Sequence, residues 1–193
     1  MYPSSARRRL PRRVLTALLA LTASLAAVPL ASPAHAVADD PVCYRGPSPA
    51  AYYKITNVKT GKSLNVARKS KAAGAPVIQW TYAGGTNEQW RALCVAPFQY
   101  KLVARHSGLA LDLAGGGAAA DAAVIQNPYT EAPSQKWGIW RAGQSGALAT
   151  FQLYNQGTGK VIDAGSDGTA LRQAAIQDGN ESQVWTFEEV GPA

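Results

Sequence analysis

The chain contains one pattern of residues three times, and this repeat constrains the fold more than any other feature. When the segments beginning at Tyr53, Tyr100 and Phe151 are aligned, a glycine, an apolar residue followed by Asn or Asp, and a tryptophan recur in the same order. The glycines are spaced by 47 and then 51 residues and the tryptophans by 47 and then 48, typical lengths for one unit of a repeat protein. The recurring residues are Gly61, Gly108 and Gly159, and Trp90, Trp137 and Trp185. We therefore expect three copies of one structural unit.

Each copy is predicted to form four short β-strands. Alternating apolar residues such as Tyr53 and Ile55 indicate a half-buried first strand, and a turn containing the glycine follows. A short second strand leads through a Gly-, Ala- or Ser-rich loop to a third strand, at Val77–Trp80 or its equivalents. The tryptophan opens the fourth strand. Ala114–Ala123 contains three consecutive glycines and is predicted to be a loop rather than a helix.

Three four-stranded units favour a β-trefoil. Propeller blades also have four strands, but propellers usually need four or more blades to close their ring. A closed barrel with pseudo-threefold symmetry and a hairpin cap accommodates three copies, so the expected fold is all-β with twelve strands. Its repeats are expected at about 51–97, 98–148 and 149–189, between an N-terminal tail at 37–50 and a C-terminal tail at 190–193. The expected core residues are Trp90, Trp137 and Trp185, with Ile78, Ile125 and Ile176.

The first 36 residues have the pattern of a secretory signal peptide. Five arginines lie within the first thirteen residues, and no acidic residue precedes Asp39. The apolar run Val14–Ala31 and the small-residue site Ala34-His35-Ala36 follow. A membrane anchor is the alternative, since the run is borderline in length, but Pro29 and Pro33 disfavour it. We therefore expect a secreted, extracellular protein without membrane insertion.

Most of the net charge of +7 belongs to this leader. Cleavage after Ala36 leaves 14 Lys and Arg against 12 Asp and Glu. Nucleic acid and anionic membranes are therefore not expected as partners, because neutralising phosphates requires a strongly basic surface. The sequence gives no sign of an oligomer, so a monomer is the default expectation.

The two cysteines, Cys43 and Cys94, are expected to form a disulfide in an oxidising extracellular compartment. Such a bond closes a loop of about 50 residues and is worth about 3–4 kcal/mol of loop entropy. A reactive thiol is the alternative, but neither cysteine has a nearby cluster of His or Lys to lower its pKa.

The Q-x-W motifs Gln135-Lys136-Trp137 and Gln183-Val184-Trp185, each preceded by Gly-x-x-x-Asp, resemble those of the ricin B-type lectin family. The resemblance extends from about Ala51 to Glu188 and implies a β-trefoil that binds carbohydrate, with galactose- or xylose-type sugars or a polysaccharide as ligand. In that family an Asp after the second strand accepts hydrogen bonds from sugar hydroxyls, and an aromatic near the third strand stacks on the ring. Asn and Gln before the Trp complete the polar set. A carboxylate and an aromatic ring match the hydroxyls and the C–H face of a neutral sugar.

These roles give three candidate pockets. The first contains Asn65, Gln79, Trp80, Tyr82, Asn87 and Glu88. The second contains Asp112, Gln126, Asn127, Tyr129, Ser134 and Gln135. The third contains Asp163, Gln177, Asp178, Ser182 and Gln183, and it lacks an aromatic. Gln135 and Gln183 could instead bond only to backbone, and Asp112 and Asp163 could serve only in turns.

Catalysis is not expected. His106 is the one histidine outside the leader, and it is predicted to lie exposed in a turn. Asp112 and Asp163 belong to different repeats and so are not expected to face one glycosidic bond. No cofactor or metal is expected, since Asp163 and Asp178 are too few for calcium.

Two other functions stay open from the sequence. A protein-binding trefoil such as a secreted hydrolase or protease inhibitor would need a protruding loop, for which 114–123 and 143–150 are the candidates. The other is a remnant module with a purely structural function.

Overall fold

The computed structural model describes residues 43, 46–165 and 170–193, so the predicted signal peptide at 1–36 lies outside the described residues. The described chain forms twelve β-strands joined by turns and five short 3₁₀ segments. None of its helical segments is long and apolar enough to cross a membrane. The strands are β1 (Ala51–Asn57), β2 (Ser63–Val66), β3 (Val77–Trp80), β4 (Gln89–Ala96), β5 (Gln99–Ala104), β6 (Ala110–Leu113), β7 (Val124–Asn127), β8 (Trp137–Ser145), β9 (Leu148–Asn155), β10 (Val161–Asp163), β11 (Arg172–Ala174) and β12 (Trp185–Pro192).

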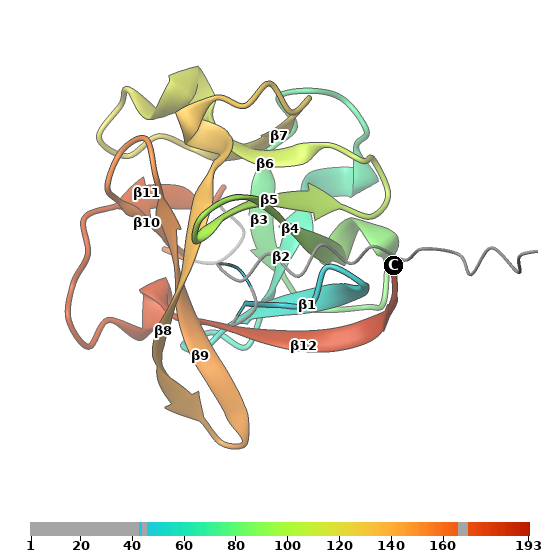
Figure 1. Ribbon diagram of the computed structural model, residues 1–193, viewed down its shortest axis with the longest axis vertical. Helices are drawn as coiled ribbons and strands as arrows, with labels where there is room; N and C mark the ends of the chain where they lie inside the picture. Colours follow the sequence, from blue (N-terminus) through green and yellow to red (C-terminus); the bar gives the residue numbers. More distant parts are fainter. Residues whose placement is uncertain (1–42, 44–45, 166–169) are drawn as a thin grey trace, which may run out of the picture. The chain divides into compact units, whose positions relative to one another are not determined.

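The strands form a closed barrel with three hairpins attached (Figure 1). In the barrel, β1 pairs with β4, β4 with β5, β5 with β8, β8 with β9, β9 with β12, and β12 with β1, all antiparallel. The hairpins β2–β3, β6–β7 and β10–β11 each extend from the first strand of a repeat. We call β1–β4, β5–β8 and β9–β12 lobes 1, 2 and 3. The predicted twelve-stranded β-trefoil is confirmed.

The three repeated tryptophans form the centre of the core. Trp90, Trp137 and Trp185 are fully buried, as predicted. Each indole Nε1 donates a hydrogen bond to a second-strand carbonyl: Leu64 at 2.9 Å, Leu111 at 3.0 Å and Ile162 at 3.3 Å. The indole therefore fills the barrel and also satisfies its only polar atom, as a buried Trp requires.

The core assignment of Ile78, Ile125 and Ile176 was wrong. Ile78 and Ile125 are only partly buried, and Ile176 is 42% exposed. The fully buried residues are instead Val77, Val124 and Leu171. The third strand has apolar residues on both of its faces, so alternation alone did not identify the inner face.

Each repeat turns sharply at its glycine. The φ values of Gly61, Gly108 and Gly159 are 69°, 71° and 71°, a left-handed backbone that glycine adopts without a Cβ clash.

The boundaries of the strands differ from expectation at two places. β8 and β9 form a long hairpin across most of 143–150, which was expected to be a loop (Figure 1). β12 continues to Pro192, past the expected domain end at 189.

The expected disulfide is present. Cys43 and Cys94 are bonded, and their sulfur atoms join the segment before β1 to β4. Tyr100 strengthens the same connection, because its hydroxyl donates to the carbonyl of Cys43 at 3.1 Å.

A buried glutamine on each third strand connects one lobe to the next. Gln79 Nε2 donates to the carbonyl of Ala164 in lobe 3, and Gln126 Nε2 donates to the carbonyls of Ser70 and Ala72 in lobe 1. Gln173 Nε2 donates to the carbonyl of Gly117 in lobe 2. The links therefore run in a cycle around the threefold axis.

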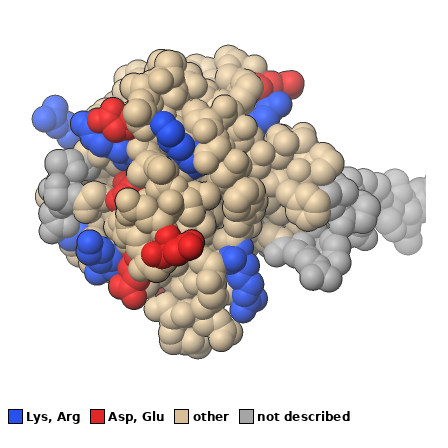
Figure 2. All heavy atoms as spheres, turned by 90° about the vertical axis from the view of Figure 1, so that its left-hand side faces the viewer, with Lys and Arg blue, Asp and Glu red and all other residues tan. Residues whose placement is uncertain are grey.

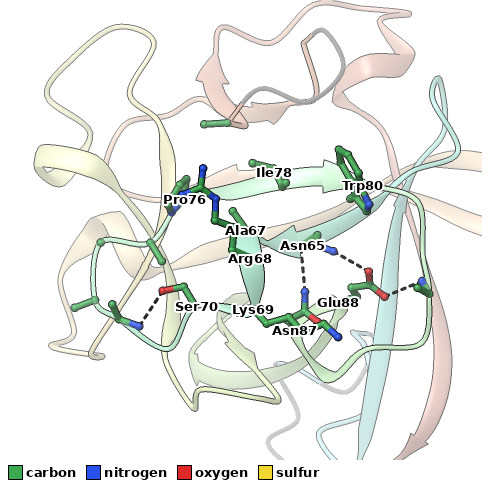
Figure 3. A pocket seen from close by; sticks show the side chains of 16 residues that line it. Asn65, Ala67, Arg68, Lys69, Ser70, Pro76, Ile78, Trp80, Asn87 and Glu88 are labelled. Atoms are coloured by element: carbon green, nitrogen blue, oxygen red, sulfur yellow. Dashed lines mark hydrogen bonds between the residues drawn. The ribbon is translucent and has the colours of Figure 1, made fainter.

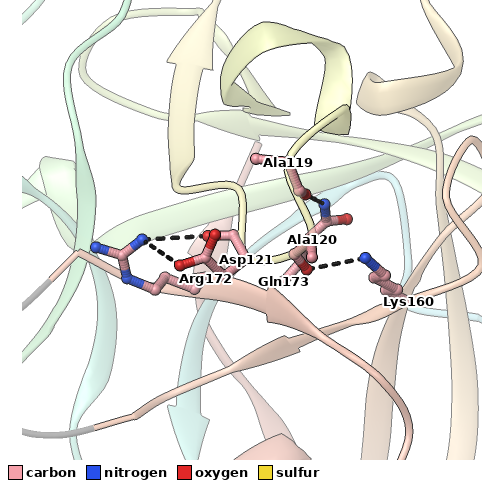
Figure 4. Close-up of polar contacts among 6 residues, drawn as sticks. All are labelled: Ala119, Ala120, Asp121, Lys160, Arg172 and Gln173. Atoms are coloured by element: carbon pink, nitrogen blue, oxygen red, sulfur yellow. Dashed lines mark hydrogen bonds and ion pairs between the residues drawn. The ribbon is translucent and has the colours of Figure 1, made fainter.

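Charged side chains of lobe 3 also contact segment 114–123 of lobe 2, which contains Gly117 (Figure 4). Lys160 Nζ donates to the carbonyl of Ala120 at 2.8 Å, and Arg172 forms an ion pair with Asp121 at 3.2 Å. The segment 114–123, predicted to be a protruding loop, is thus fastened to a neighbouring lobe. It begins with a short 3₁₀ turn, η3 (Ala114–Gly117).

Candidate functional site

A hydrogen-bonded pair of one carboxylate and one amide side chain lies at the end of the second strand in every lobe. In lobe 2, Gln135 Nε2 donates to Asp112 Oδ2 at 3.1 Å. In lobe 3, Gln183 Nε2 donates to Asp163 Oδ2 at the same distance. The glutamine lies just before the core tryptophan, so the barrel fixes its place. The fold therefore brings together two residues that the sequence assigned to the same candidate pocket in each of these lobes.

Lobe 1 has the same pair with the two chemical groups exchanged. Asn65 stands at the aspartate position and Glu88 at the glutamine position, and Asn65 Nδ2 donates to Glu88 Oε1 at 2.8 Å. Glu88 Oε2 accepts hydrogen bonds from the backbone N–H groups of Ala83 and Gly85. Each lobe thus keeps one carboxylate, but in lobe 1 it comes from the loop before β4 rather than from β2.

A hollow of about 910 Å³ opens beside the lobe 1 pair (Figure 3). We call it the first-lobe hollow. Its polar end contains Asn65, Asn87 and Glu88, and Trp80 lies close to them at the end of β3. The remaining lining comes from residues 67–70 and 72–76, with Ile78, Ala83 and Ala170. Trp80 is 54% exposed, so a large part of its side chain is free to contact a ligand.

The polar end of the hollow has hydrogen-bonding capacity that the protein does not use. Asn87 Nδ2 donates to Asn65 Oδ1 and to the carbonyl of Val66, which fixes the orientation of the amide. Asn87 Oδ1 is buried and has no hydrogen-bond partner among the described residues. Gly85 leaves room beside it, because a Cβ there would stand 2.6 Å from this oxygen. A buried unpaired acceptor is costly, and a ligand hydroxyl would satisfy this one only if the side chains that cover it moved aside.

The candidate residues of lobe 2 are largely occupied by one another. Asn127, at the position of Trp80, donates from Nδ2 to Asp112 Oδ2 at 2.9 Å and accepts from the N–H of Gly74. Asp112 Oδ1 accepts from the N–H of Leu113, so both oxygens of this buried carboxylate have partners. The carboxylate therefore has less capacity left for a sugar than the sequence suggested.

Tyr129 remains the aromatic of lobe 2, with a cation over its ring. Lys101 Nζ lies 4.4 Å from the ring centroid, and in lobe 1 Lys54 lies 5.3 Å from Tyr82 in the same way. Partial burial, with a smaller contribution from Glu131, raises the pKa of Tyr129. Tyr82 accepts a hydrogen bond from Gln89 and does not line the first-lobe hollow.

The third candidate pocket has its polar groups, and none of its candidate residues is aromatic, as the sequence indicated. Asp163 accepts hydrogen bonds from Gln183, Ser182 and the N–H of Gly165. Asp178 is exposed in the loop after β11 and forms no contact with Asp163 within the described residues. Among those residues, no group of three or more His, Cys, Asp or Glu could hold a metal ion.

Three glutamines predicted to contact sugar need correction. Gln79 and Gln126 are fully buried and bond to backbone carbonyls, so they connect lobes instead of facing a ligand. Gln177 is not their equivalent: Gln173 pairs with Ile162 as Gln79 pairs with Leu64. The third copy is shorter than the other two between its second and third strands, so Gln177 falls beyond the third strand. Gln177 instead lies in the exposed loop, and its N–H donates to Gln183 Oε1 at 2.9 Å.

His106 is also less exposed than predicted. It is partly buried, and its Nε2 lies 2.8 Å from the carbonyl oxygen of Ser70.

On the face drawn in Figure 2, basic and acidic side chains are interspersed among uncharged ones.

Comparison with known proteins gives one family and many structures. The model of the ricin-type beta-trefoil lectin domain-like family matches residues 43–127, which contain β1–β7. Comparison with curated protein sequences gives no significant match.

Among solved structures, the designed threefold-symmetric protein ThreeFoil is 36% identical, with a TM-score of 0.67 over 72% of this chain and 99% of its own. An exo-beta-1,3-galactanase from Clostridium thermocellum is 27% identical, with a TM-score of 0.66 over 72% of this chain, but the match spans only 30% of the galactanase. The ricin B-like lectin of Macrolepiota procera, solved with lactose, shares the fold at 23% identity, with a TM-score of 0.62 over 75% of this chain and 99% of its own. With the repeats, the barrel and the paired polar residues in place, the chain belongs to the ricin-type β-trefoil lectin domain-like family.

Proposed function

We propose that the protein is a secreted, non-catalytic lectin that binds carbohydrate in the first-lobe hollow. The observation that carries this proposal is the position of the exposed Trp80 beside the polar end of the hollow. The indole offers an apolar surface to the C–H face of a sugar ring. Asn65, Asn87 and Glu88 offer donors and acceptors to its hydroxyls.

The comparisons support a carbohydrate as the ligand class. The family is a lectin family, and the fold neighbour from Macrolepiota procera was solved with lactose bound. We propose a galactose- or xylose-type sugar or a polysaccharide built from them. Lobes 2 and 3 would contribute weaker sites. Both oxygens of Asp112 already accept hydrogen bonds from the protein, and the candidate pocket of lobe 3 has no aromatic residue.

The test is calorimetric titration of the protein with galactosides, xylan, arabinan and glucan fragments. Trp80→Ala should weaken binding at least tenfold, or about 1.4 kcal/mol, because it removes the stacking surface. It should leave the fold intact, since this side chain is half-exposed. Trp140→Ala is the matched control, because Trp140 is 43% exposed on β8 and does not line the hollow. Absence of binding to every sugar tested, or equal losses in both variants, would contradict the proposal.

Export is part of the proposal and rests on the leader pattern in residues 1–36. The disulfide is consistent with an oxidising compartment. N-terminal sequencing of protein collected from culture medium should begin at Val37. Protein retained in the cells with an intact leader would oppose it.

A further inference from the structure

Two cationic residues of lobe 1 adopt a backbone conformation that lobe 2 reserves for glycine. Arg68 and Lys69, in the turn after β2, have φ values of 55° and 54°. The equivalent residues after β6 are Gly115 and Gly116, with φ values of 60° and 67°. Left-handed backbone is sterically unfavourable for a residue with a Cβ, and such strain concentrates at functional sites. Lobe 1 therefore holds two long side chains at positions where glycine would fit more easily.

Both side chains line the first-lobe hollow. In Figure 3, Arg68 extends toward Pro76, at the opposite end of β3 from Trp80. The four residue steps from Pro76 to Trp80 correspond to about 13 Å of strand. The hollow is therefore longer than one sugar ring, and the end to which Arg68 extends lies beyond the ring that Trp80 would hold, while Lys69 lies nearer Asn87 in the same view.

No ion pair among the described residues neutralises the positive charge of the hollow. Within the described part of the chain, neither Arg68 nor Lys69 has an ion-pair partner. Of the described residues that line the hollow, Glu88 is the one that is acidic, and its carboxylate already accepts hydrogen bonds from Asn65, Ala83 and Gly85. The lining thus has two cations against one carboxylate.

We propose that the first-lobe hollow is selective for acidic oligosaccharides. One sugar unit lies on Trp80, and the neighbouring unit presents a carboxylate or sulfate to Arg68, while Lys69 adds a second positive charge to the lining of the hollow. A guanidinium binds either anion through two parallel hydrogen bonds, and the ammonium adds a second charge. This inference rests on the proposed function, since it assigns the ligand class of the same site.

The test compares each acidic ligand with its neutral counterpart. One arm uses trigalacturonate and its methyl ester, and the other uses a sulfated galactobiose and galactobiose itself. At physiological salt we expect at least one acidic ligand to bind ten times more tightly than its neutral form. The arm that shows the preference identifies the anion as a uronate or a sulfate. The preference should shrink as salt is added, because exposed charges are screened.

The Arg68→Gly/Lys69→Gly double variant copies the lobe 2 turn. It should lose the acidic preference, keep its affinity for the neutral ligands, and melt at the same or a higher temperature, because the left-handed strain is relieved. Lys59→Ala/Lys71→Ala is the matched control: it removes the same charge from exposed residues outside the hollow and should keep the preference.

Equal binding of acidic and neutral ligands by the unmodified protein would overturn this inference and leave the proposed function standing. An acidic preference that survives in the glycine variant would overturn it as well. Failure to bind any ligand, acidic or neutral, would instead refute both proposals.

Discussion

At the scale of single residues, the most informative feature is the exchange of amide and carboxylate between Asn65 and Glu88. Lobes 2 and 3 place the carboxylate on the second strand and the amide before the tryptophan, whereas lobe 1 does the reverse. Both arrangements have one donor facing one acceptor. The pair is therefore conserved as a hydrogen bond even though neither residue is the same, which a comparison of single positions does not reveal.

This exchange predicts a compensating pair of substitutions. Glu88→Gln should destabilise the protein by about 1–3 kcal/mol. The new glutamine has only one oxygen, and the N–H groups of Ala83 and Gly85 still need that oxygen as their acceptor. Its amide nitrogen would then face Asn65 Nδ2, another donor. Adding Asn65→Asp recreates the lobe 2 pair and should restore most of the loss.

Urea unfolding of both single variants and the double variant measures this coupling. Asn65→Asp alone should also destabilise, because it sets two carboxylates against each other. Simple additivity of the two single effects would mean that the two side chains do not form the interaction described.

Residue-level prediction from the sequence was good for the tryptophans and poor for the glutamines. A Trp that recurs in register must fill equivalent positions of a shared core, so its burial followed from the repeat alone. Gln79 and Gln126 are polar and lie beside a candidate aromatic, so a ligand contact was a reasonable interpretation. Their actual partners are backbone carbonyls of another lobe, which are distant in sequence and visible only in the folded chain.

At the scale of elements, these glutamines make the third strands the connectors between lobes. Gln126→Ala should destabilise the protein by about 1–3 kcal/mol, because it removes a fully buried side chain together with its hydrogen bonds to the carbonyls of Ser70 and Ala72. Gln177→Ala is the control and should change stability little, since Gln177 is exposed. Chemical denaturation measures both effects. Equal losses of stability in the two variants would mean that Gln177, and not only Gln126, has the role of a lobe connector.

The order of the elements was predictable, but one register was not. The turn glycines and alternating apolar residues located twelve strands. The third copy misled the alignment, because its loop between β10 and β11 is shorter and Ile176-Gln177 happens to repeat the residues of Ile78-Gln79. Chance identity over two residues thus outweighed the pairing geometry, which only the structure supplies.

At the scale of the whole molecule, the disulfide joins the segment before β1 to the barrel. Replacing Cys43 and Cys94 by Ser should cost about 4 kcal/mol of stability, since the bond closes a loop with a sequence separation of 51 residues. Sugar binding at temperatures where the protein stays folded should not change, because neither cysteine lines the hollow. Thermal melting followed by titration separates the two effects. A variant that stays as stable as the parent would show that the hydrogen-bonded barrel alone supplies the stability.

The pairing of β1 with β12 has a consequence for how the chain could be rewired. The N–H of Ala193 donates to the carbonyl of Ala50 at 2.8 Å, so the start of lobe 1 and the end of lobe 3 are in direct contact. A short linker between them would make the three lobes a continuous circle of polypeptide. That circle could be opened at the exposed turn beside Phe98, giving a circular permutant with the lobe order 2, 3, 1. Every pair of neighbouring barrel strands would be kept, so the fold does not require the three lobes to follow one another in the order 1, 2, 3.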